Sequence, residues 1–156
     1  MSERSQRLAA YARQFLSNQP LANEANINRN RLLDEGFLRL KESMRLEFEA
    51  QTEEFNREPG CGNVLVCNFS NDKSSVSRMD DPESQLLIQF DPHIRMVSIK
   101  CERPVKLTFY VGVKLTTNET NWYYVAGEKK TELSPCNDRV DWVVDKALYA
   151  LFGVRT

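Results

Sequence analysis

Few residues of this chain have the types and spacing that catalysis requires. The 156 residues include a single histidine, His93, and only six glycines. His93 follows Asp91-Pro92, which predicts an exposed β-turn, and neither neighbour is a serine or cysteine that it could activate. Gly60-Cys61-Gly62 is the nearest thing to a phosphate loop, but it leads from a predicted helix into a predicted strand, the wrong order for an anion site. We expect no catalytic residue and a protein that is not an enzyme.

Acidic residues and cysteines gather without the pattern of a metal site. Asp80, Asp81 and Glu83 lie at a predicted turn and lack the spacing and the glycine of a calcium loop. The glutamates of residues 47–54 have no Glu-x-x-His motif beside them. The four cysteines form no CxxC pair, and each is interpreted as a reduced thiol. We therefore expect neither a metal nor a cofactor.

The composition is that of a soluble globular domain. Hydrophobic residues make up 41% and charged residues 28% of the chain, and the formal net charge is −1. The N-terminus carries charges throughout and lacks the apolar run of an export signal, and no apolar stretch is long enough to span a bilayer. We expect a cytoplasmic protein that does not enter membranes.

The hydrophobic pattern predicts one α+β domain over residues 1–156 that begins with two helices. Within residues 1–30, apolar residues at helical spacing predict a short helix over 3–17, which Pro20 ends, followed by an Asn-rich connection. Residues 31–58 form a long helix with its own apolar stripe. Gly36 is a weak point of that helix, at a cost of about 1 kcal/mol relative to alanine if it is exposed to solvent.

From residue 63 to residue 133, apolar and polar residues alternate within short segments separated by turns. This pattern predicts an antiparallel β-meander of four to six strands. The clearest strand is Val105–Leu115, whose odd-numbered residues are apolar. Residues 134–153 then form a C-terminal helix packed on the sheet. Ser134 and Pro135 suit the first positions of that helix, and Gly153 suits its end.

The helix lengths predict an interface. A helix over residues 31–58 is about 40 Å long, whereas five strands span only about 24 Å. Leu33 and Phe37 should therefore lie beyond the sheet, covered either by the first helix, folded back as an αα-hairpin, or by a second copy of the protein. We favour a homodimer, with Leu8 and Phe15 of the first helix beside Leu33 and Phe37.

An alternative site lies on the opposite face of the sheet. Lys106, Tyr110 and Lys114 share the outward side of their strand, and aromatic and basic side chains together bind small ligands or single-stranded nucleic acid. Charge disfavours nucleic acid: residues 1–31 hold five basic and two acidic residues, whereas residues 32–58 hold four basic and eight acidic. The sequence thus favours a cytoplasmic, non-enzymatic protein of protein–protein interaction, with a homodimer or another protein as partner.

Overall fold

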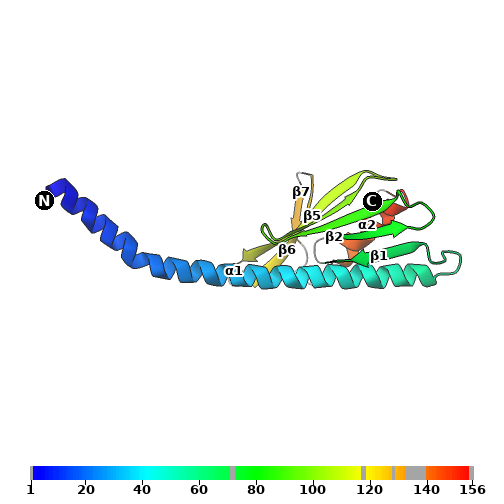
Figure 1. Ribbon diagram of the computed structural model, residues 1–156, viewed down its shortest axis with the longest axis horizontal. Coiled ribbons are helices and arrows are strands. Elements are labelled where there is room, and N and C mark those ends of the chain that lie inside the picture. The colour runs from blue at the N-terminus through cyan, green and yellow to red at the C-terminus, as the bar shows by residue number, and fades with distance from the viewer. Residues whose placement is uncertain (1, 71–72, 117–118, 128, 133–139, 155–156) are drawn as a thin grey trace. The chain divides into compact units, whose positions relative to one another are not determined.

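The computed structural model describes residues 2–70, 73–116, 119–127, 129–132 and 140–154 (Figure 1). The chain divides into two compact units, residues 1–32 and residues 33–156. The described residues confirm the predicted α+β fold class: a long N-terminal helix, an antiparallel sheet and a C-terminal helix. Among them, no helix combines the length and the apolar character that crossing a membrane requires.

The N-terminal helix α1 (Glu3–Arg57) is continuous, so the prediction of two helices with a connection between them was wrong. A proline inside a helix removes one backbone hydrogen bond and costs about 3 kcal/mol, which is why Pro20 predicts a break. Residues 19–30 contain no glycine and no second proline, so nothing else there ends the helix. The predicted end of the long helix near residue 58 is confirmed, since α1 ends at Arg57. Gly60 and Gly62, just beyond it, both have positive φ angles.

Seven strands follow α1 among the described residues, and each pairs antiparallel with the next. They are β1 (Leu65–Phe69), β2 (Lys73–Arg78), β3 (Gln85–Asp91), β4 (Met96–Cys101), β5 (Leu107–Thr116), β6 (Glu119–Ala126) and β7 (Lys129–Glu132). The predicted meander is confirmed, although the predicted strand number was too low. Strand β7 was missed because its sequence, KKTE, shows no apolar alternation.

One face of the sheet is buried under helices. Along β5, Phe109 and Val111 are buried whereas Thr108 and Tyr110 are exposed, as the alternation predicts. From Leu33 onward, α1 lies along the buried face, and helix α2 (Asp141–Leu151) packs on the same face (Figure 1). The centre of this core comprises Leu40, Met44, Phe48, Ile88, Ile99, Phe109, Trp122, Val143, Val144 and Ala147.

Helix α2 ends as the sequence predicts, with Gly153 at a φ of 77° and its N–H donating to the carbonyl of Ala150 at 3.2 Å. The predicted start at Ser134 and Pro135 lies outside the described residues. The side chains that α2 buries all face the sheet core: Val143, Val144, Ala147, Ala150 and Leu151.

Leu33 and Phe37 do not lie beyond the sheet, so that prediction was wrong. They are 8% and 4% exposed and belong to the protein's own core. Two contacts show why the sheet reaches the start of this helical segment. The guanidinium Nε of Arg95, in the β3–β4 turn, bonds Asp34 Oδ1 at 2.8 Å, and the guanidinium of Arg39 donates to the hydroxyl of Thr120, in β6, at 2.6 Å. Seven strands cover more of the helix than the five assumed from sequence.

Candidate binding surfaces

The first candidate surface is an apolar stripe on α1 within residues 1–32. Leu8, Tyr11, Phe15 and Leu16 follow helical spacing and are 70%, 73%, 69% and 60% exposed. These four residues are called the N-terminal stripe. Arg4 and Arg7 lie four residues before Leu8 and Tyr11, so each is one turn away from an apolar residue of the stripe. Of the four residues predicted to form an interface, Leu8 and Phe15 are therefore exposed, whereas Leu33 and Phe37 are core residues.

The second candidate surface is the outward face of the sheet. Lys106, Tyr110 and Lys114 share one side of β5 and its entry, as the alternation predicts, and Tyr110 is 39% exposed. Beside it, the ring of Tyr123 covers Gly112 so closely that a Cβ atom there would lie 2.4 Å from the ring. Lys130 Nζ lies 4.3 Å from the centroid of the same ring, so Tyr123 is packed rather than available for stacking.

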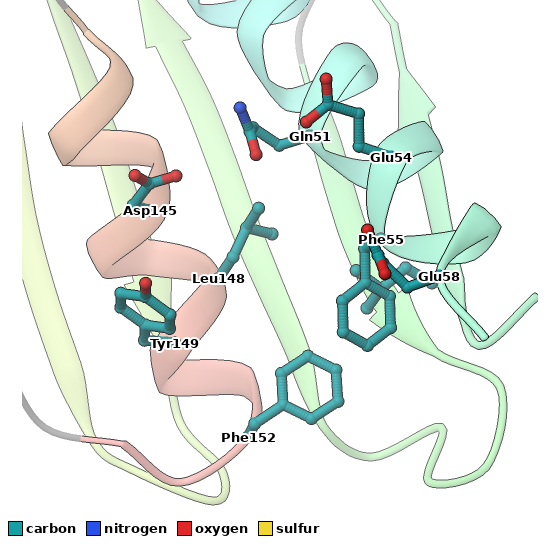
Figure 2. A pocket seen from close by; sticks show the side chains of 9 residues that line it. Gln51, Glu54, Phe55, Glu58, Asp145, Leu148, Tyr149 and Phe152 are labelled. Atoms are coloured by element: carbon teal, nitrogen blue, oxygen red, sulfur yellow. The ribbon is translucent and has the colours of Figure 1, made fainter. Parts of the chain in front are cut away.

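The third candidate surface is a groove between the end of α1 and α2, which the sequence analysis did not find. It encloses about 260 Å³ (Figure 2). Its floor is apolar: Leu148 points from α2 toward α1, and the rings of Phe55 and Phe152 meet with centroids 5.0 Å apart. The acidic groove, as it is called below, is lined by Gln51, Glu54, Phe55, Glu58, Leu65, Asp145, Leu148, Tyr149 and Phe152.

Three carboxyl groups, those of Glu54, Glu58 and Asp145, surround this floor, and none of the described residues that line it is basic. The ion pairs of the described residues include none of the three. Partial burial, with the nearby carboxylate of Asp141, raises the pKa of Asp145. The groove is therefore an apolar depression with a negative rim.

Arg78 holds the α2 end of the acidic groove in place. Its guanidinium donates to the carbonyl of Leu151 at 3.1 Å and lies 4.8 Å from the ring centroid of Phe152. The same guanidinium bonds the carboxylate of Asp80 at 3.0 Å. Because one side chain fixes both the last turn of α2 and the ring that closes the groove, the floor is formed without a ligand.

Sequence reasoning missed the acidic groove because its parts lie about ninety residues apart. From sequence, Glu54 belongs to a charged face of the long helix and Asp145 to the C-terminal helix. The signals present in the sequence were local: Glu54 and Glu58 lie one helical turn apart on either side of Phe55, and Asp145 interrupts the apolar C-terminal helix. Each signal alone describes an ordinary amphipathic helix, and only packing brings them together.

Among the described residues, no group of three or more histidine, cysteine, aspartate or glutamate residues is placed to hold a metal ion. His93 is exposed in the β3–β4 turn, where its backbone N–H donates to Asp91 Oδ1 at 3.0 Å. Cys61, Cys67 and Cys101 are free thiols, and Cys136 lies outside the described residues.

Comparisons of the chain with models of protein families, with curated proteins and with solved structures found no match.

Proposed function

We propose that this protein is a non-enzymatic interaction protein that self-associates through its N-terminal stripe. The observation that carries the proposal is the exposure of Leu8, Tyr11, Phe15 and Leu16, each at 60% or more, on one side of a helix. Isolated apolar residues are normal on a protein surface, but a contiguous patch of large ones marks an interaction site.

Burial of this stripe would favour association. Each large apolar side chain contributes about 1.5–3 kcal/mol when it is fully buried. Two of the four are aromatic, a type enriched at the centres of protein interfaces. A stripe at positions i, i+3, i+7 and i+8 is also the pattern with which a helix docks into a groove or against another helix.

The test is the mass of the particle in solution. We expect the wild-type chain to form a dimer or larger assembly at micromolar concentration, measured by light scattering after size-exclusion chromatography and by native mass spectrometry. The double variant Leu8→Asp/Phe15→Asp should run as a monomer with an unchanged circular dichroism spectrum. The matched control, Gln6→Asp/Ala10→Asp, adds the same charge on the opposite side of the helix and should associate like wild type. A wild-type monomer at the highest attainable concentration would contradict the proposal.

The outward face of the sheet supports a second function, binding of a small ligand or single-stranded nucleic acid. The observation in its favour is that Tyr110 keeps an exposed ring on the same face as Lys106 and Lys114. Fluorescence anisotropy with a labelled oligothymidylate at low salt tests it. Salt-sensitive binding that Tyr110→Ala abolishes would support this function, and no binding at low salt would exclude it for nucleic acid.

A further inference from the structure

We infer that the acidic groove receives the N-terminal stripe of a second copy of this chain. The inference rests on the proposed self-association and names the surface that the stripe contacts. Three features of the acidic groove point to this occupant: its size, its charge and the spacing of its carboxylates.

The size of the acidic groove suits side chains rather than a separate ligand. Pockets for drug-sized molecules usually measure about 300–1,000 Å³. The groove encloses about 260 Å³ and lies open between two helices, with an apolar floor of Phe55, Leu148 and Phe152. A space of this size and polarity accommodates one or two large apolar side chains that project from a helix lying across it. Leu8 and Phe15, seven residues apart on one side of α1, are such a pair.

The charges favour the acidic groove of the second copy, rather than its N-terminal stripe, as the surface to which the stripe of the first copy binds. Residues 1–31 hold five basic and two acidic residues, and Arg4 and Arg7 border the stripe itself. Parallel pairing of two stripes would bring these arginines together, where they would repel, and antiparallel pairing would place them against a segment with only two acidic residues. Docking a stripe in the acidic groove would instead place them beside Glu54, Glu58 and Asp145, none of which takes part in the ion pairs of the described residues. Complementary charge of this kind steers association and disfavours the wrong pairing.

The spacing of the charges also matches. Glu54 lies in the last turn of α1 and Glu58 directly follows the helix, so the two carboxylates flank Phe55 in the sequence. Arg4 lies one turn before Leu8, and Arg7 lies one turn before Tyr11, so on the stripe, as in the groove, each charge lies within four residues of an apolar side chain. A helix that inserts its apolar residues between α1 and α2 can therefore bring an arginine to the carboxylates along the rim.

A complementation experiment with two full-length variants tests the inference. The stripe variant is Leu8→Asp/Phe15→Asp, which keeps an intact groove. The groove variant is Glu54→Lys/Glu58→Lys, which keeps an intact stripe and changes only exposed side chains. Each variant alone should be monomeric, with a dissociation constant raised at least tenfold over wild type. An equimolar mixture should associate, because the groove of one variant takes the stripe of the other. Native mass spectrometry with one partner labelled by ¹⁵N identifies the mixed species.

Two controls make the experiment specific. Glu102→Lys/Glu119→Lys makes the same change in net charge outside the groove and should leave self-association unchanged. Arg4→Glu/Arg7→Glu, combined with the groove variant in one chain, reverses both sets of charges and should restore association. Circular dichroism and thermal unfolding establish that each variant is folded before its mass is interpreted.

The possible failures are distinguishable. If the groove variant alone associates like wild type, stripes pair with stripes: this inference is then wrong and the proposed function stands. If both folded variants are monomeric alone and their mixture stays monomeric, the inference is also wrong. If wild type itself is monomeric, the proposed function fails together with the inference.

Discussion

Gly36 of α1 lies so close to Thr120 of β6 that a Cβ atom added to the glycine would lie 2.9 Å from both the Cβ and the Oγ1 atom of the threonine. Gly36 is buried, and the guanidinium of Arg39 donates to the same Thr120 hydroxyl at 2.6 Å. From sequence, this glycine is a weak point of the helix. In the structure, it permits the close approach of helix and sheet.

Gly36→Ala should therefore destabilise the protein, although alanine is the better helix former. Overpacking a tight contact costs about 1–3 kcal/mol, which outweighs the gain of about 1 kcal/mol in helix propensity. Urea unfolding measures the change. The same substitution in a Thr120→Gly background should cost less, because the atoms that it meets are gone. A stabilised Gly36→Ala variant would show that α1 shifts easily over β6.

Leu33→Asp and Leu8→Asp should have opposite consequences. Leu33 is a core residue, so an aspartate there buries an unpaired charge and should cost about 3–5 kcal/mol of unfolding free energy. Leu8 is exposed, so an aspartate there should leave the thermal unfolding of the monomer within about 0.5 kcal/mol of wild type. Differential scanning calorimetry compares the two. Equal destabilisation would mean that Leu8 is also covered within one molecule.

Asn56→Ala should weaken the attachment of the edge strand β1 to helix α1. The Asn56 side-chain amide donates to the carbonyl of Leu65 at 2.9 Å and accepts from the Leu65 N–H at 3.1 Å. One side chain therefore satisfies both backbone groups of Leu65, the first residue of the edge strand β1. Loss of both bonds should cost about 1–3 kcal/mol. Hydrogen exchange should show faster exchange of the Leu65 amide, whereas Glu53→Ala, on the exposed side of α1, should leave that amide unchanged. Unchanged protection in Asn56→Ala would contradict this role.

Cys67 should resist alkylation near neutral pH. Burial, with a smaller contribution from the carboxylate of Glu49, raises the pKa of this thiol to about 11. Only the thiolate reacts, and at pH 7.5 its fraction is then roughly one in three thousand. Iodoacetamide labelling followed by peptide mass spectrometry should show slow modification that accelerates up to about pH 11. Glu49→Gln should lower the pKa and speed the reaction. Labelling as fast in the folded as in the urea-unfolded protein would contradict the shift.

Asp145→Asn should stabilise the protein near neutral pH. Burial, then the neighbouring Asp141, raises the pKa of Asp145 above its unfolded value, so the folded state disfavours the ionised carboxyl group. Glu54, from α1, and Glu58, directly after that helix, line the same groove. The penalty is absent below the unfolded pKa, where the carboxyl is protonated in both states, and is complete above the folded pKa. The gain in melting temperature should therefore be present at pH 7 and vanish near pH 3. A gain independent of pH would point to packing instead.

The sequence by itself determined the α+β fold class and the order of N-terminal helical segment, antiparallel sheet and C-terminal helix, because the periods of its apolar residues are local physical signals. Alternation in Val105–Leu115 specifies a strand with one buried face, and Gly153 specifies the end of α2. The exposed position of His93 likewise follows from its turn sequence. Pro20 shows where local signals mislead: a proline disfavours a helix at one position, and the residues on either side continue it.

Only the tertiary structure decided which apolar residues become core and which become surface. Leu33 and Leu8 carry the same local signal on helical stripes, but Leu33 is buried in the core, whereas Leu8 is 70% exposed. The acidic groove depends on the same fact, since Glu54 and Asp145 meet only because α1 and α2 pack on one face of the sheet. Local sequence sets which side of an element is apolar. What covers that side depends on contacts between residues far apart in the chain, and no local period encodes them.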